Sequence, residues 1–234
     1  MLLRKEVIRF RKVSVQTVLA PVVSAVLFLI VFQHVLAGRI ELPGGITSLQ
    51  QNAFANSSSS LTQSKVTGNL VFLLLTPLPA WSWFVGYVGG GVIRGLVVGI
   101  AVWLSTLPFV WTWPLYPGYA LAMLLIAAVL MSALGLLAGL WADKWDQLSL
   151  FQSFLINPLS FLAGVFYSVQ SLEEPWKSLA HGNPFFFMID GLRWAFFGVS
   201  DAAAALDFAV SLGFCVTISL LCWLLLARGW RIRH

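Results

Sequence analysis

Three long runs of apolar residues, almost without charge, constrain this chain more than any other feature. Residues 83–110, 118–141 and 203–227 are each long enough for a helix to cross a bilayer, which takes about 20 residues. The composition agrees, because 59% of the residues are hydrophobic and only 10% are charged, whereas soluble domains carry about 25% charged residues. Backbone N–H and C=O groups in lipid must form their hydrogen bonds within the segment, as they do in a helix. We therefore expect one all-α membrane domain.

Six membrane-spanning helices are expected, with both termini in the cytoplasm. Lys and Arg gather at both ends of the chain, and cytoplasmic segments are the ones enriched in these residues. Two cytoplasmic ends require an even number of crossings, and the sequence offers five apolar spans and one polar candidate. With six, ten of the 14 Lys and Arg residues lie inside, three lie outside and Arg94 lies within a span. The expected spans are residues 18–37, 46–65, 83–110, 118–141, 148–168 and 203–227.

Residues 46–65 are long enough to cross but far too polar to face lipid. A polar helix is stable in a bilayer only where its polar face meets protein or water. We therefore hypothesise that four of its residues face the interior of the bundle and border a translocation path. These are Gln51, Asn52, Asn56 and Ser59, and Arg94 of the next span is a further candidate. Two simpler accounts stay open: the segment does not cross, and Arg94 extends toward the membrane surface.

Residues 1–16 predict an amphipathic helix that lies on the membrane surface. Leu3, Val7 and Phe10 follow helical spacing and form an apolar stripe, and basic residues occupy the opposite face. Such a helix binds the interface of an anionic leaflet. A basic tail without defined structure is the alternative. The remaining residues 17–234 form the transmembrane domain.

The stretch between residues 168 and 203 predicts two short re-entrant helices that dip into the outer membrane interface. Each covers about ten residues, half of what a crossing needs, and both are rich in Trp and Phe, which suit that interface. Ser171 and Glu174 fit a capping box, and Asn183 before a proline fits a helix N-cap. Asp190 and Arg193 are spaced to pair on the second helix. A soluble aromatic core is the alternative.

Glycines recur every four residues in two of the expected spans. Small residues at this spacing let helix backbones approach closely, where lipid provides no hydrophobic drive for association. We therefore expect tight helix packing at these faces. The pairs are Gly86/Gly90, Gly91/Gly95, Gly95/Gly99 and Gly135/Gly139.

Several kinds of chemistry find no support in the sequence. The chain has no Gly-Lys pair, so it contains no phosphate-binding P-loop, and it has no Gly-x-Ser-x-Gly nucleophile motif. Its three histidines, His34, His181 and His234, are scattered, which argues against a metal site. The basic residues lie at the ends of spans and not on a repeated face, so nucleic acid is not an expected partner. These features favour a transporter subunit over an enzyme.

Three stretches of the chain together resemble type-2 ABC exporter permeases. The resemblance covers nearly the whole length, and the order and spacing of the stretches carry it more than any single one. Arg9-Phe10 and Gln16-Thr17 are similar to the family's amphipathic first helix, and Leu70 to Gly95 is similar to its middle. The C-terminal half is represented by Asn157-Pro158-Leu159-Ser160-Phe161-Leu162-Ala163-Gly164-Val165-Phe166-Tyr167, Asn183-Pro184 and Asp190-Gly191-Leu192-Arg193.

The resemblance implies a permease of the bacterial inner membrane that exports a lipid, a polysaccharide or a drug-like compound. It implies that a separate ABC ATPase subunit uses ATP and Mg²⁺, that this chain binds no cofactor, and that two permeases work with two ATPases. The element that docks on the ATPase would contain Lys65, Gly68, Asn69 and Pro77. The alternative is an ATP-independent channel or secondary transporter, but acidic or histidine relays within spans and inverted halves are not found.

One departure from the family pattern concerns the second span. Family members carry an apolar run before the segment that reads Gln-Asn-Ala-Phe-Ala-Asn here, at residues 51–56. About a dozen residues of that run are expected to be missing, given the length that a crossing requires.

Overall fold

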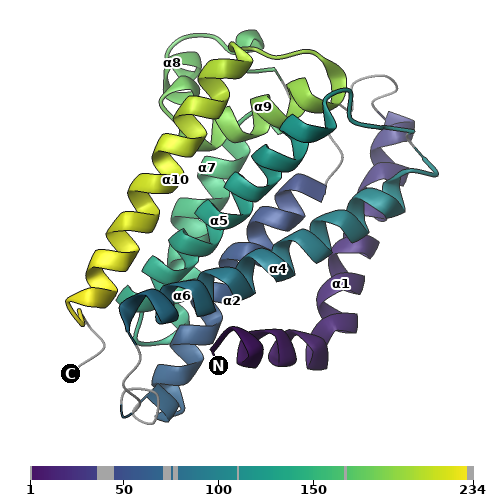
Figure 1. The fold of residues 1–234 in the computed structure, drawn as a ribbon. Coiled ribbons are helices and arrows are strands. Elements are labelled where there is room, and N and C mark those ends of the chain that lie inside the picture. The colour runs from purple at the N-terminus through teal and green to yellow at the C-terminus, as the bar shows by residue number, and fades with distance from the viewer. Residues whose placement is uncertain are drawn as a thin grey trace.

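The computed structural model describes residues 2–35, 45–70, 75, 79–109, 111–165 and 168–230. Within these ranges the chain is helical and forms no strand. The helices, labelled as in Figure 1, are α1 (Leu2–Val35), α2 (Gly45–Val66), α4 (Ala80–Thr106), α5 (Pro117–Trp141), α6 (Trp145–Phe151), the π-helix η1 (Gln152–Ile156), α7 (Asn157–Leu162), the 3₁₀ turn η2 (Val169–Ser171), α8 (Trp176–His181), α9 (Pro184–Phe197) and α10 (Ala204–Ala227).

The helix lengths and their apolar surfaces confirm an all-α membrane protein. Helices α4, α5 and α10 are long and apolar enough to cross a bilayer, and α1 adds a fourth candidate if its two halves form one span. Helix α10 in particular exposes a row of large aliphatic side chains, which suits contact with hydrocarbon. The total of six crossings stays a prediction.

Helix α1 bends by 63° between its segments Leu2–Arg11 and Val13–Leu27. The sharp turn of its purple ribbon near the N-terminus is visible in Figure 1. The sequence predicted that the surface helix ends at residue 16, about one turn after the observed bend. Leu3 and Val7 of the predicted apolar stripe are exposed, as a surface helix requires.

Helix α2 occupies the centre of the bundle and packs most extensively against α4 and α5. Helix α2 is not among the described helices that are apolar enough to cross a bilayer by composition. The reason is that its buried face carries polar side chains at every turn. These are Gln50, Asn56, Ser57, Ser58, Ser60, Thr62 and Ser64.

The predicted glycine faces explain how this polar helix is enclosed. A Cβ atom added at Gly95 of α4 would lie 2.8 Å from the Cβ of Ala53, and one added at Gly139 of α5 would lie 2.9 Å from the carbonyl oxygen of Ser58. Both distances are far below ordinary contact, so only glycine lets α4 and α5 approach α2 this closely. The prediction of close packing is confirmed for six of the seven glycines, whereas Gly99 lines a cavity. The six are Gly86, Gly90, Gly91, Gly95, Gly135 and Gly139.

The fifth expected span, residues 148–168, is a broken helix in the structure. Segments α6, η1 and α7 follow one another from Trp145 to Leu162, so the helical run ends six residues earlier than predicted. Pro158 has no N–H to bond to the preceding turn, and the π-helix directly before it relieves the mismatch. Gly164, with a φ of +75°, then turns the chain.

The two short helices expected before the last span are α8 and α9. The side chain of Asn183 accepts a hydrogen bond from the N–H of Phe185 at 3.0 Å, so the predicted N-cap is confirmed. The capping box of Ser171 and Glu174 is wrong, because α8 begins only at Trp176. Glu174 instead accepts from the hydroxyl of Ser178 at 2.7 Å, and this bond lowers the pKa of its exposed carboxyl.

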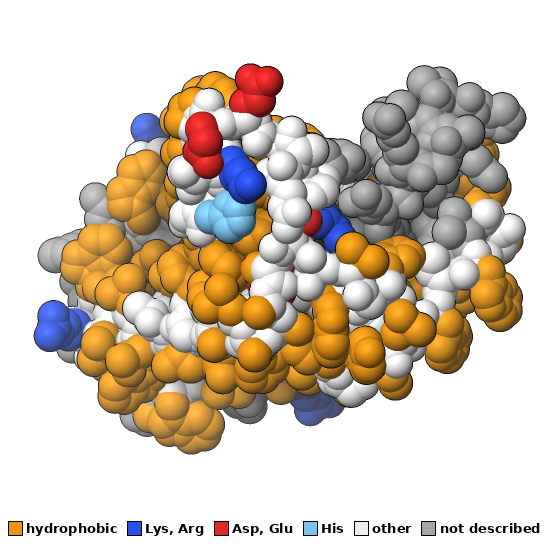
Figure 2. Space-filling model, turned by 90° about the horizontal axis from the view of Figure 1, so that it is seen from above, with side chains coloured by type: hydrophobic (Ala, Val, Ile, Leu, Met, Phe, Trp, Pro, Cys, Tyr) orange, Lys and Arg blue, Asp and Glu red, His pale blue; other side chains and the backbone are white. Residues whose placement is uncertain are grey.

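The two ends of the helix bundle carry different side chains. Leu2, Leu61, Leu140 and Leu226 share one buried cluster, so the start of α1 and the ends of α2, α5 and α10 lie together. Basic residues flank these helix ends, namely Arg4, Lys5, Lys65, Lys144 and Arg228. Figure 2 looks onto the opposite end, where a small group of charged side chains is surrounded by hydrophobic ones.

Candidate functional site

A polar network joins α1, α2 and α4 inside the bundle. Arg94 of α4 donates to the side-chain oxygen of Asn56 at 3.3 Å and to that of Asn52 at 3.5 Å, both on α2. Arg94 is half-buried, so its charge is directed toward α2 rather than only toward the membrane surface. Three of the residues predicted for a translocation path are therefore brought together.

The network continues from α2 to the first helix. Arg9 donates to the hydroxyl of Ser59 at 2.9 Å, and the hydroxyl of Ser60 donates to Glu6 at 2.6 Å. Glu6 is 1% exposed and lies 3.9 Å from Arg9. A buried carboxylate needs such partners, because desolvation without them is costly. Ser59, one of the predicted path residues, thus takes part in the network, as do Glu6 and Arg9, which were not predicted.

Gln51 lies outside this network. Its side chain is exposed on another face of α2 and lines a small cavity with Asn157 and Ser160 from the broken helix. The sequence predicted that it faces the interior with Asn52, Asn56 and Ser59, whereas the structure exposes it. Ser57, which was not predicted, does face the interior, where its hydroxyl donates to the carbonyl of Tyr87 at 3.1 Å. A Cβ atom added at Gly91 of α4 would meet the hydroxyl of Ser57, but the sequence gives no signal for this contact between helices.

The predicted ATPase-docking residues gather at the basic end of α2. Lys65 donates to the carbonyl of Leu140 at 2.7 Å and to that of Ala142 at 3.1 Å, so it binds the end of α5. Gly68, with a φ of +72°, forms the turn after α2. Asn69 is exposed and lines a cavity of about 310 Å³ together with Lys5 and Arg9 of α1. Pro77 lies outside the described residues.

An ion-pair cluster fixes α9 to its surroundings at the opposite end. Arg193 lies 3.3 Å from Asp190, as its spacing predicted, and also 3.3 Å from Asp201. It donates as well to the carbonyl oxygen of Gly164. Asp190 in turn accepts from the N–H groups of Asp201 and Ala202 at 2.8–2.9 Å.

The charged side chains of this cluster are buried and pair with one another. Asp190 is 0% exposed and Arg193 is 3% exposed. Asp201 accepts from the hydroxyl of Ser168 at 2.7 Å and from the N–H of Val169 at 2.8 Å, so it also holds the loop after α7. These contacts anchor α9 to the loop after α7 and to the loop that follows α9. Sequence reasoning missed Asp201 because it lies in a loop.

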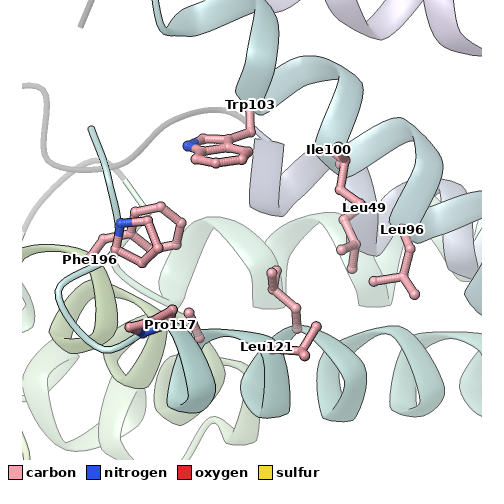
Figure 3. A pocket seen from close by; sticks show the side chains of 11 residues that line it. Leu49, Leu96, Ile100, Trp103, Pro117, Leu121 and Phe196 are labelled. Carbon is pink, nitrogen blue, oxygen red and sulfur yellow. The ribbon is translucent and has the colours of Figure 1, made fainter. Parts of the chain in front are cut away.

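An apolar cavity of about 250 Å³ lies between α4 and α5 near the start of α2. Figure 3 shows Leu96, Ile100 and Trp103 of α4 on one side of it and Pro117 and Leu121 of α5 on the other. In the described residues, no group of three His, Cys, Asp or Glu side chains is placed to hold a metal ion.

Comparisons with known proteins identify the family. The sequence model of a family described as "ABC-2 type transporter" matches residues 1–197. A protein named "Inner membrane transport permease YadH" from Escherichia coli (strain K12) is 38% identical over 245 aligned residues, which cover 98% of this chain and 94% of that protein. Proteins of the same name from Escherichia coli O157:H7 and Shigella flexneri align with the same values.

The alignment also bears on chain length. Its 245 residues exceed the 234 of this chain, so the relative carries at least eleven residues without a counterpart here. This difference is close to the shortfall expected for the second span, although the position of the extra residues stays a prediction. The family model matches most of the chain and the relative aligns with 98% of it, so the chain belongs to the ABC-2 type transporter family and is a multi-pass inner-membrane permease of an ABC transporter.

Proposed function

We propose that the chain is the transmembrane subunit of an ATP-driven exporter that moves a lipid, polysaccharide or drug-like substrate out of the cytoplasm. ATP and Mg²⁺ bind to a separate ABC ATPase subunit, and two permeases assemble with two ATPases. The single observation that carries the proposal is the family match over residues 1–197. The sequence has no P-loop of its own, so the energy for transport comes from a partner.

The ATPase docks at the basic end of the bundle. Asn69 and Thr67 are exposed there, beside the cavity that Lys5 and Arg9 help to line. Lys65 connects this turn to the end of α5 through two backbone carbonyls. A displacement of the docked turn is therefore passed to α2 and α5 together.

The polar face of α2 borders the substrate path. Arg94 donates to Asn52 and Asn56 of α2. Ser59, about one turn further along α2, accepts from Arg9, so these polar side chains form a row. Ionisable groups at membrane depth are costly and mark pathways more often than structure. A change in how α2 packs against α1 and α4 alters this row, which gives the ATPase a way to open the path.

Both termini face the cytoplasm in this proposal. The basic residues that flank the ends of α1, α2, α5 and α10 gather at one end of the bundle, as positive-inside topology requires. Glu173 and Glu174 lie at the other end, beside α8.

The test is co-expression of the chain with the ABC ATPase encoded nearest to its gene, followed by purification in detergent. We expect a two-plus-two complex by native mass spectrometry and ATP hydrolysis that depends on the P-loop lysine of the ATPase. Asn69→Trp should weaken the complex, since a large side chain would then stand on the docking turn. The control is Glu173→Trp, an equally exposed position at the opposite end. An ATPase that binds Asn69→Trp as well as wild type contradicts the docking surface, and ion conduction by the chain alone contradicts the proposed function.

A further inference from the structure

The apolar cavity between α4 and α5 offers a ligand almost no polar surface. Its walls are formed by Leu49, Leu96, Gly99, Ile100, Trp103, Pro114, Pro117, Ala120, Leu121, Leu124 and Phe196. The indole N–H of Trp103 already donates to the carbonyl of Thr112 at 3.3 Å. Water needs two to four polar partners to occupy a cavity, so this one does not hold ordered water.

The described start of α2 lies at one end of the cavity. Leu49 packs beside Gly95 of α4, and four described residues of α2, from Gly45, precede it. Helix α4 continues eleven residues beyond Gly95, to Thr106. Within the described residues, α2 thus extends about one turn past Leu49 on this side, whereas α4 extends about three turns past Gly95. Leu49 forms the floor of the cavity, and Trp103 and Phe196 lie at its far end (Figure 3).

The rim of the cavity opens toward the outside of the bundle. Ile100 is 49% exposed and Leu121 is 58% exposed, although both are large apolar residues. In an inner-membrane permease, the medium that such side chains meet is lipid hydrocarbon and not water. Hydrocarbon that enters from this side gains contacts with walls that otherwise lack partner atoms.

We propose that this cavity holds one acyl chain of a bilayer lipid, which enters sideways between Ile100 and Leu121. The acyl chain fills the space between α4 and α5 and keeps the two helices at their observed separation. The proposal rests on the membrane location and does not depend on ATP-driven export. It therefore stands or falls separately from the proposed function.

The test uses proteoliposomes that contain phosphatidylcholine with a diazirine on one acyl chain. After illumination, crosslinked peptides are mapped by mass spectrometry. In wild type we expect crosslinks at the cavity-lining segments of α4 and α5 that exceed those on the exposed face of α10, which measures lipid that merely surrounds the protein. Gly99→Leu should lose the crosslinks in α4 and α5 and keep those in α10, because the new side chain fills the cavity.

The matched control is Gly213→Leu, because a Cβ atom at Gly213 meets nothing within 4 Å and the position lies on the exposed face of α10. It should keep the wild-type pattern. If Gly99→Leu does not fold, Ala120→Leu fills the same cavity from α5 and gives the same readout. Crosslinking of the filled variants at the wild-type level overturns the proposal, and so does a wild-type pattern in which α10 is labelled as strongly as the cavity.

Discussion

Gly135→Leu is expected to remove most folded protein from the membrane fraction. A Cβ atom at Gly135 would lie 3.0 Å from the carbonyl carbon of Phe54 and closer still to its oxygen. The obstacle is backbone of α2, which cannot rotate away as a side chain can. Overpacking of a core by larger side chains typically destabilises by about 1–3 kcal/mol, and a clash with backbone should reach or exceed the upper limit. Native stabilities are only about 5–15 kcal/mol.

The measurement is the yield of monodisperse protein in detergent together with its thermal unfolding temperature. Gly213→Leu is the control here too, because it adds the same side chain to a spanning helix where space is open. It should leave both quantities close to wild type. If Gly135→Leu unfolds at the wild-type temperature, the close packing of α2 against α5 is not as the structure has it.

Arg193→Ala should destabilise the protein by about 3–5 kcal/mol, the usual effect of removing one partner of a buried ion pair. The loss leaves Asp190, which is 0% exposed, and Asp201 without their counter-charge. It also removes the donor to the carbonyl of Gly164. Arg193→Lys should recover only part of the loss, since an ammonium group cannot reproduce the planar, forked contacts of arginine.

The free energy of unfolding in a mild detergent with added denaturant reports this effect. Arg228→Ala, at an exposed position after α10, is the matched control and should change stability by less than about 0.5 kcal/mol. Combining Arg193→Ala with Asp201→Asn should be less harmful than the sum of the two changes, because the residues are in contact. Additive effects would show that the three charged groups do not act as one cluster.

The parts of the fold that follow from local chemistry were predictable from the sequence. The spacing of glycines predicted the faces of α4 and α5 that enclose α2. Asn183 before a proline predicted the start of α9. The break at Pro158 was harder to place, because a proline near an apolar run fits both a continuous and a broken helix.

The candidate site was only partly predictable, because hydrogen bonds between helices depend on rotation about each helix axis. Polarity alone placed Gln51 inside, although the structure exposes it and buries Ser57. Asp201 and Glu6 were missed for other reasons. One lies in a loop and the other on a basic surface helix, and neither location hints at a buried carboxylate. Contacts over more than 50 residues, such as Ser60 with Glu6, are set by the packed bundle.

Polar α2 is the buried central helix of the bundle, and we propose that its Lys65 end lies at the cytoplasmic surface. Cysteine accessibility along residues 45–66, in intact cells and inverted vesicles, tests it most directly once Cys215 and Cys222 are replaced by alanine. The account predicts that cysteines at the buried positions Ser57 and Ser60 resist a membrane-impermeant maleimide from either side. A cysteine at the exposed Gln63 should react only from the cytoplasmic side. Uniform labelling of the whole segment from one side would contradict it.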